Sequence, residues 1–245
     1  MIAQPVNDTF KFKRFSVRHD RCAMKIGTDA ILLGSWASAV DPANILDIGT
    51  GCGVIALMLA QRFPKAQVHA VELDEQAANQ ASENFRDSPW TDRLSILASP
   101  VQAFSSDDKF DLITSNPPYF NDGLKPPDAN RAAARHDDNL PTHELMEAVA
   151  RLLNGSGHFS AIVPCERAEE FEAAATYQNL VCRRRCLVLP TPTAPPKRVM
   201  LEFRRTDSNH VCDVASEESS LIVELERHQY SQEYAELAKD FLLKL

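Results

Sequence analysis

The sequence lacks several features that define other classes of protein. No stretch of its 245 residues is apolar for long enough to span a bilayer, and the N-terminus has no apolar core of a signal peptide. There is no low-complexity tract, and the six cysteines form no C-x-x-C pair. These absences predict a cytoplasmic protein with reduced thiols and no membrane partner, and with neither a zinc site nor a disulfide framework.

Positive charge is also scarce, since the formal net charge is −8 at pH 7. An acidic surface repels nucleic acid, but the placement of charge matters more than its sum. Acidic side chains concentrate in residues 166–172 and 217–236. The first residues instead interleave phenylalanines with cations: Lys11, Lys13, Arg14, Arg18, Arg21 and Lys25. Such a segment can bind phosphate, although a solvated surface is the simpler explanation of any one basic cluster.

With 44% hydrophobic and 24% charged residues, the chain can bury the core of one domain. We expect a monomer in which residues 1–40 cover a ligand site on the main domain, residues 41–245. Apolar periodicity predicts helices at residues 29–38, 53–62, 74–87, 141–153, 166–178 and 231–243. It predicts strands at residues 9–17, 44–48, 67–72, 94–98, 110–115, 157–163, 180–189, 198–204 and 221–225. Residues 121–139 are expected to form a lid or substrate clamp, and residues 206–220 an exposed linker.

Strand–helix alternation predicts an α/β fold with a doubly wound, mostly parallel sheet, which binds ligands at the carboxyl ends of its strands. At one such end, Gly49-Thr50-Gly51-Cys52-Gly53 separates the strand Asn44–Ile48 from a helical pattern that begins at Val54. Glycines let the backbone turn tightly and approach a ligand without Cβ atoms in the way. A tight turn without a ligand would need the same residues.

Two carboxylates accompany this glycine turn. Glu72 ends the next strand about twenty residues further on, where a carboxylate can accept both hydroxyls of a ribose. The spacing is G-x-G-x-G rather than the dinucleotide G-x-G-x-x-G. Asp47 would repel a pyrophosphate but attract a cationic, amino-acid-like group. The set favours an adenosyl ligand with a sulfonium and an α-amino group over NAD.

The most informative motif is Asn116-Pro117-Pro118-Tyr119, directly after the apolar run Phe110–Ser115. Prolines have no N–H to give a sheet, so the strand must end at this rigid corner. The amide oxygen of Asn116 and the carbonyl of Pro117 can accept the hydrogens of a planar NH2 group, while Tyr119 or Phe120 stacks on its plane. That geometry suits an exocyclic amine such as adenine N6. A proline-stiffened loop without chemistry is the alternative.

These motifs resemble the Rossmann-like class of S-adenosylmethionine-dependent methyltransferases, in which Asn-Pro-Pro-Tyr marks enzymes that methylate planar amino nitrogens. Residues 15–34, 84–90, 196–201 and 230–234 are similar to segments of the bacterial tRNA(Val) (adenosine-37-N6)-methyltransferases. The resemblance implies S-adenosylmethionine as cofactor, a tRNA anticodon loop as partner, and an antiparallel edge strand in the sheet. It implies no metal.

The motifs and the resemblance together assign roles to individual residues. The catalytic set is Asn116, Pro117, Pro118 and Tyr119. The cofactor set is Lys25, Thr28, Asp47, Gly49, Thr50, Gly51, Glu72, Leu73, Ser99, Pro100 and Asn116. The RNA-binding set is Lys13, Arg14, Arg18, Phe120, Arg131 and Arg135. A helix N-cap explains Thr28 equally well, and Ser99-Pro100 stands where this class usually has an acidic residue for the adenine amino group.

Other functions share some of these features. Protein-glutamine N5-methyltransferases use the same tetrapeptide, but they resemble a longer design with a helical domain before the glycine turn. The tetrapeptide alone does not exclude an RNA guanine-N2 methyltransferase. An RNA-binding protein with a vestigial cofactor fold is the non-enzymatic alternative, and the intact Asp47, Glu72 and Asn116 count against it.

Overall fold

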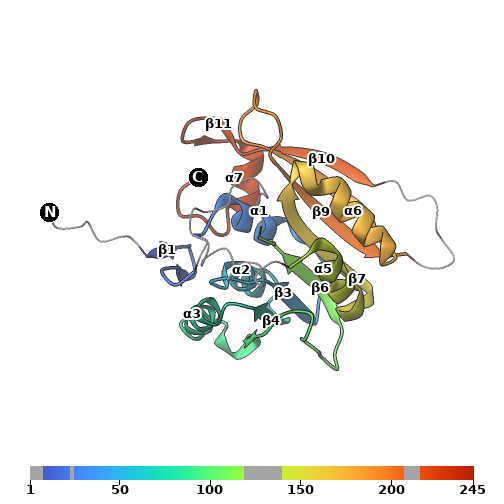
Figure 1. The fold of residues 1–245 in the computed structure, drawn as a ribbon. Helices are drawn as coiled ribbons and strands as arrows, with labels where there is room; N and C mark the ends of the chain where they lie inside the picture. The colour runs from blue at the N-terminus through green and yellow to red at the C-terminus, as the bar shows by residue number, and fades with distance from the viewer. Residues whose placement is uncertain (1–7, 23–24, 119–139, 207–215) are drawn as a thin grey trace, which may run out of the picture.

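The computed structural model of the chain describes residues 8–22, 25–118, 140–206 and 216–245. Its centre is an eight-stranded sheet in the order β10-β8-β9-β7-β6-β3-β4-β5, with helices on both faces (Figure 1). Two antiparallel ribbons lie outside the sheet: β1 (Thr9–Lys11) with β2 (Ser16–Arg18), and β11 (Glu224–Glu226) with β12 (Gln229–Tyr230). The predicted fold class, a doubly wound and mostly parallel sheet, is confirmed.

The first half of the sheet is parallel throughout. It consists of β3 (Asn44–Ile48), β4 (Gln67–Glu72), β5 (Leu94–Ala98) and β6 (Phe110–Ser115). The helices α2 (Val54–Arg62) and α3 (Glu75–Arg86) connect β3 to β4 and β4 to β5. Because each helix returns the chain to the start of the next strand, the carboxyl ends of all four strands meet at one edge. This edge carries the predicted site.

The second half of the sheet differs from the prediction. It contains β7 (Leu153–Pro164), β8 (Leu180–Leu189), β9 (Arg198–Arg205) and β10 (Glu217–Ile222). The antiparallel strand is β9, which lies between β7 and β8, so its predicted place at the edge is wrong. The edge is β10, which pairs in parallel with β8, although residues 217–220 were expected in an exposed linker. β8 offers β10 a row of free backbone groups, and a mostly polar sequence can satisfy these as well as an apolar one.

Helices cover both faces of the sheet. One face packs on α1 (Thr28–Trp36), α2, α3 and α7 (Gln232–Ala238), and the other packs on α5 (Thr142–Leu152) and α6 (Ala168–Tyr177). Short 3-10 turns precede β5 (Thr91–Arg93) and α6 (Cys165–Arg167). The side chains of β3 alternate between the two faces of the sheet. Ile45 packs in the core on the side of α1, α2, α3 and α7, and Leu46 and Ile48 pack in the core on the side of α5 and α6.

Two predicted helix ends are wrong. The N-cap of α1 is Gly27, which has no side chain to give a hydrogen bond, and Thr28 is the first helical residue. Helix α7 ends at Ala238, before the predicted residue 243. Its start is as expected, since the hydroxyl of the N-cap Ser231 accepts the backbone N–H of Tyr234 at 3.0 Å.

The N-terminal ribbon buries Phe12 and Phe15 and half-buries Phe10. The rings of Phe12 and Phe15 stack with their centroids 4.4 Å apart, and Phe15 meets the edge of Trp90 at 5.5 Å. The backbone N–H of Lys13 donates to the carbonyl of Phe241 at 2.8 Å, which fixes the ribbon to the last residues of the chain. Ring packing and this hydrogen bond therefore hold in place the backbone that carries the cations.

The cysteine side chains and the lengths of the helices bear on two further expectations. The thiols of Cys22, Cys52, Cys165, Cys182 and Cys186 are free, and Cys212 lies outside the described residues. Within the described ranges, no helix combines the length and apolar character needed to cross a bilayer.

Candidate active site

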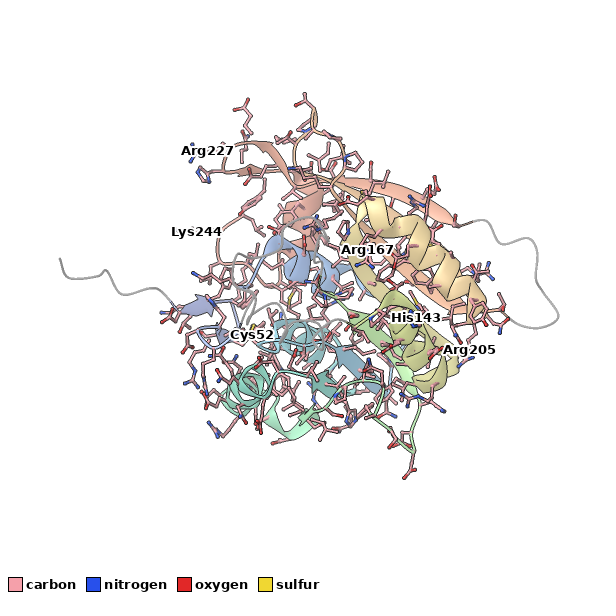
Figure 2. The ribbon with its side chains drawn as sticks, in the orientation of Figure 1. Cys52, His143, Arg167, Arg205, Arg227 and Lys244 are labelled. Atoms are coloured by element: carbon pink, nitrogen blue, oxygen red, sulfur yellow. The ribbon has the colours of Figure 1, made fainter. Side chains whose placement is uncertain are left out.

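The glycine turn after β3 has one open side and one closed side. Gly49, Gly51 and Gly53 have φ angles of +69°, +56° and +85°, which side chains with a Cβ rarely adopt. A Cβ added to Gly49 or Gly51 would meet nothing within 4 Å, whereas one on Gly53 would lie 2.5 Å from the ring of Phe85 in α3. The first two glycines therefore leave the backbone open to a ligand, and the third lets α2 and α3 pack closely. Figure 2 shows Cys52 of this turn on the same side of the molecule as the N-terminal ribbon.

Glu72 is fixed against the open side of the turn. Its Oε2 accepts the backbone N–H of Gly51 at 2.7 Å, and its Oε1 accepts the N–H of Asp74 at 3.0 Å. A carboxylate has about four lone-pair positions, so these two bonds orient the group and leave it free to accept more. Glu72 is half-buried at the end of β4, as a residue that holds ribose hydroxyls needs to be.

Asp47 is buried beneath the turn. Only 1% of it is exposed, and hydroxyl groups bind both of its oxygens: Thr50 donates to Oδ2 at 2.6 Å and Thr114 to Oδ1 at 2.8 Å. Burial raises the pKa of the Asp47 carboxyl to about 6, and the two hydroxyls and a backbone N–H oppose that rise. Glu72 nearby raises the same pKa further. A carboxylate held ionised in this place would favour a cation beside it.

The Asn-Pro-Pro corner begins beside the glycine turn. Strands β3 and β6 are neighbours, with Ile48 opposite Ser115, and the hydroxyl of Ser115 donates to the carbonyl of Ile48 at 3.0 Å. Gly49 directly follows β3, and Asn116 directly follows β6. The structure thus brings together the predicted cofactor turn and the predicted amine-binding residue. Asn116 and Pro118 are half-buried and Pro117 is buried.

Three further members of the predicted cofactor set lie near Glu72. The backbone N–H of Ser99 donates to the carbonyl of Glu72 at 2.9 Å, and the Ser99 hydroxyl donates to the carbonyl of Pro100 at 3.1 Å. Leu73 is 45% exposed beside them. This corner offers an apolar side chain and backbone groups to an adenine, with no carboxylate at the position of Ser99.

Two residues without a predicted role hold the N-terminal segment at this site. The amide of Asn84 accepts the backbone N–H of Arg18 at 3.0 Å and donates to the carbonyls of Arg18 at 2.9 Å and Cys52 at 2.8 Å. Gln80 accepts the N–H of Arg21 at 3.1 Å. Both amides are buried in α3 and four residues apart, on the face that also carries Ala77 and Ala81. Polar amides at helical spacing on an apolar face were the signal that could have revealed them.

The predicted RNA-binding cations are placed unequally. Arg18 pairs at 2.6 Å with Asp87, the residue that follows α3, so its charge is partly neutralised. The ammonium of Lys13 donates to the carbonyl of Lys239 at 2.5 Å, and the guanidinium of Arg14 lies 5.9 Å from the ring centre of Trp90. Tyr119, Phe120, Arg131 and Arg135 lie outside the described residues.

The segment that leads into α1 presents its polar residues at the surface. Lys25 and Thr28 are exposed, and Asp29 forms an ion pair with Arg198 of β9 at 2.8 Å. In the part of the chain that the structure describes, no group of three or more His, Cys, Asp or Glu side chains is placed to hold a metal ion.

Two solved structures with a similar fold are described as methyltransferases. A protein described as a predicted O-methyltransferase, from Agrobacterium tumefaciens, superposes with a TM-score of 0.65 and 20% identity over 87% of this chain and 96% of its own. The glycopeptide N-methyltransferase MtfA, solved with S-adenosyl-L-methionine, superposes with a TM-score of 0.53 and 11% identity over 75% of this chain and 90% of its own. The fold and a matching methyltransferase family model together define the class, the Rossmann-like methyltransferases, whose cofactor is S-adenosylmethionine.

Sequence comparison narrows the class to a family. Residues 23–163 match the family model described as the methyltransferase small domain. A relative from Bacteroides thetaiotaomicron, named tRNA1(Val) (adenine(37)-N6)-methyltransferase, is 47% identical over 240 residues, which are 98% of this chain and 99% of its own. The chain belongs to the family of tRNA1(Val) (adenine(37)-N6)-methyltransferases.

Proposed function

We propose that this protein transfers the methyl group of S-adenosylmethionine to N6 of an adenosine in a tRNA anticodon loop, adenosine 37 of tRNA(Val). The observation that carries the chemistry is the adjacency of Gly49 and Asn116 at the ends of β3 and β6. The names of the relatives support the substrate over a release-factor glutamine or a guanine N2. A tRNA substrate also makes the cytoplasm the site of action.

The residues at the glycine turn fit the cofactor. Gly49 and Gly51 leave space where side chains would otherwise stand, and Glu72 retains acceptor capacity for ribose hydroxyls. We assign the positive, amino-acid end to Asp47 and Thr50, with Lys25 and Thr28 over it. The adenine is assigned to Leu73, Ser99 and Pro100. When bound, the cofactor supplies a methyl group on a positively charged sulfur, which needs no metal to leave.

Asn116 and the carbonyl of Pro117 then act on the substrate amine. An exocyclic amine is a poor nucleophile because its lone pair is delocalised into the ring. Two acceptors that bind its hydrogens favour the tetrahedral nitrogen and direct the lone pair at the methyl group. Such positioning can supply about 7–11 kcal/mol of the acceleration. The released proton passes to water, and no dedicated general base is required.

Recognition of the RNA is assigned to stacking and to local positive charge. From the motif, Tyr119 or Phe120 stacks on the flipped base. Lys13 and Arg14, with Arg131 and Arg135, bind phosphate, while Arg18 contributes less because it already pairs with Asp87. We also assign residues 1–40 as the segment that covers the cofactor site.

Labelled-methyl transfer tests this proposal. Total tRNA from a strain that lacks the gene is incubated with the enzyme and labelled cofactor, and the product is digested to nucleosides. We expect the label in N6-methyladenosine, and none when a tRNA(Val) transcript carries guanosine in place of adenosine 37. Label in a guanine N2 or a protein glutamine, with none in adenosine, would contradict the proposal.

A further inference from the structure

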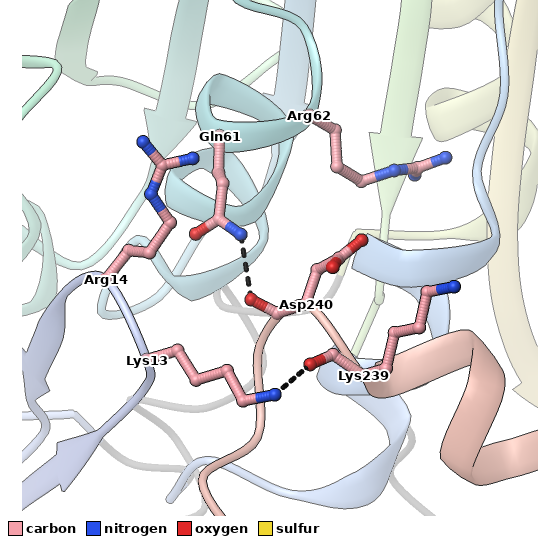
Figure 3. Close-up of a pocket in the computed structure, with 6 residues that line it drawn as sticks. All are labelled: Lys13, Arg14, Gln61, Arg62, Lys239 and Asp240. Carbon is pink, nitrogen blue, oxygen red and sulfur yellow. Dashed lines mark hydrogen bonds between the residues drawn. The ribbon is translucent and has the colours of Figure 1, made fainter.

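A basic groove lies at the end of α2 remote from the glycine turn. Its volume is about 610 Å³. Three segments that are distant in sequence form it: the loop between β1 and β2, the end of α2, and the residues after α7. The lining residues are Lys13, Arg14, Gln61, Arg62, Lys239 and Asp240 (Figure 3). Four of these six side chains are cationic and one is anionic, in a chain with a net charge of −8.

Hydrogen bonds between the three segments fix the shape of the groove. The amide of Gln61 donates to the carbonyl of Asp240 at 2.9 Å, and the ammonium of Lys13 donates to the carbonyl of Lys239 at 2.5 Å (Figure 3). The backbone bond from Lys13 to Phe241 adds a third connection. A groove built in this way is preorganised, so a ligand does not have to order its walls.

The cations of the groove differ in their availability. Arg62 donates to the carbonyls of Gly34 at 2.9 Å and Ala37 at 2.6 Å, at the C-terminal end of α1. Because these bonds occupy its guanidinium, Arg62 contributes to the groove mainly through its charge. Burial lowers the pKa of Arg62 to about 10, which leaves it charged at neutral pH. Lys239 pairs with Glu236 at the surface, where such pairs are weak.

Lys13 and Arg14 are exposed. Together with Lys239 they supply the donors that a phosphate group can reach, and Asp240 is the opposing charge among the lining residues.

The position of the groove separates it from the methyl-transfer site. Helix α2 has nine residues, so its two ends are about 14 Å apart. The body of α2 lies between the groove and the glycine turn. A polynucleotide carries a phosphate on every nucleotide, so a single RNA molecule can reach both places.

We propose that this groove binds the phosphate backbone of the tRNA at a point away from the methylated base. The inference rests on the proposed function for the identity of the RNA. Phosphate is the chemistry that fits, because the lining side chains end in ammonium and guanidinium groups, with one amide and one carboxylate among them. An acidic protein also needs such a concentrated patch to hold RNA, since most of its surface repels it.

Variants that remove or add charge in the groove test the proposal. The double variant Arg14→Gln/Lys239→Gln should bind a tRNA(Val) transcript roughly tenfold more weakly in fluorescence anisotropy, since each exposed charge contributes about two- to fivefold. The slope of log K against log salt should become shallower by about one to two. Lys109→Gln is the control, because it removes the charge of an exposed lysine outside the groove, whose ammonium donates to the carbonyl of Arg151 at 2.6 Å. It should leave both quantities unchanged.

Asp240→Asn provides a test that misfolding cannot imitate. Removal of the one anion should tighten tRNA binding by about two- to fivefold and steepen the salt slope. Calorimetric cofactor binding should be normal in every variant. Unchanged tRNA affinity in both the double variant and Asp240→Asn, with cofactor binding intact, would overturn the proposal that this groove binds the tRNA.

Nucleoside analysis of the wild-type product separates this result from the proposed function. If the label enters a nucleotide other than adenosine while the groove variants still lose RNA affinity, the proposed role of the groove in RNA binding is supported and the proposed function is wrong. If the label enters adenosine 37 while all groove variants bind tRNA normally, the proposed function is supported and the proposed role of the groove in tRNA binding is wrong.

Discussion

The side-chain amide of Asn84, in α3, donates a hydrogen bond to the carbonyl of Cys52 inside the glycine turn, at 2.8 Å. The same side chain bonds both backbone groups of Arg18. Asn84 is only 2% exposed, so water cannot readily replace these partners. One buried amide therefore couples the N-terminal segment to the turn that is proposed to hold the cofactor.

Replacement of Asn84 by alanine should damage both stability and cofactor binding. The change leaves the buried carbonyl of Cys52 and the half-buried backbone groups of Arg18 without this partner, at about 1–3 kcal/mol for a buried unsatisfied group. We expect the unfolding free energy from urea titration to fall by about 3 kcal/mol, and calorimetry to show weaker cofactor binding. Gln102→Ala is the control, since its amide bonds Glu144 at the exposed surface. Equal urea midpoints for the two variants would contradict the role of Asn84.

Glu72→Ala should weaken cofactor binding without unfolding the protein. Loss of a charged acceptor removes about 1.5–3 kcal/mol of hydrogen bonding, measured as a change in calorimetric affinity. Glu75→Ala, three residues further on and exposed in the first turn of α3, should bind normally. Unchanged affinity in Glu72→Ala, or a wild-type protein that prefers NAD, would show that the turn holds a different ligand.

The pH dependence of cofactor binding should report on Asp47. Its pKa is raised to about 6, and a bound cation favours the ionised carboxylate, so binding lowers that pKa. Affinity should therefore increase as pH rises toward 6 and level off above it, with proton release on binding near pH 5.5 in calorimetry. Asp47→Asn should flatten this dependence. A variant with the wild-type pH profile would assign the titration to another group.

The same raised pKa has the opposite effect on the protein without cofactor. The folded state holds the Asp47 proton more tightly than the unfolded chain, whose pKa is about 3.8. The contribution of this group to the unfolding free energy should therefore fall as pH rises from about 4 to 6. Urea titrations across this range should show that Asp47→Asn loses this component.

The parts of the site that the sequence predicted are those with local signals. The run Asn44–Ile48, its glycines and the Asn-Pro-Pro corner each carry their structure in their own residues: apolar period, positive φ and missing N–H groups. Glu72 could be placed because it ends a short apolar strand. Parallel topology then brings these strand ends to one edge without further information.

The parts that the sequence did not predict depend on distant partners. The first four residues of β10, Glu-Glu-Ser-Ser, become part of a strand because the edge of β8 is free, whereas Leu221 and Ile222 fall within the predicted strand 221–225. Thr114 holds Asp47 only because the register of β3 and β6 places the two residues opposite each other. The predicted cap at Thr28 failed for a local reason, since Gly27 already occupies the N-cap position.

A buried carboxylate in the second half of the sheet gives a stability prediction independent of the active site. Glu202 is fully buried and pairs with Arg184 at 2.8 Å and Arg204 at 3.1 Å, with His158 at 3.4 Å. Burial alone would raise the pKa of Glu202, but His158 and Arg184 lower it to about 2. Glu202→Gln should lower the unfolding free energy at pH 7 by about 3 kcal/mol, because it removes the buried negative charge that pairs with Arg184 and Arg204.

The sign of this effect with pH follows from the lowered pKa. The stabilisation by Glu202 is complete above pH 4.5 and is lost as pH falls toward 2. The difference between wild type and Glu202→Gln should therefore shrink in urea titrations at pH 3. Glu218→Gln, on the exposed part of β10, should match the wild type at both pH values. A difference as large at pH 3 as at pH 7 would mean that packing, not charge, explains the loss.

Asn116 gives the most direct test of the chemistry. Asn116→Ala should reduce methyl transfer to tRNA by at least about a hundredfold, the effect of a misplaced reacting group. Cofactor affinity should stay nearly intact, because Asn116 acts on the substrate amine. Asn116→Asp keeps an oxygen acceptor at the same position and should retain part of the activity. Near-normal turnover in Asn116→Ala would mean that another group orients the amine, and the adjacency of β3 and β6 would then no longer explain the reaction.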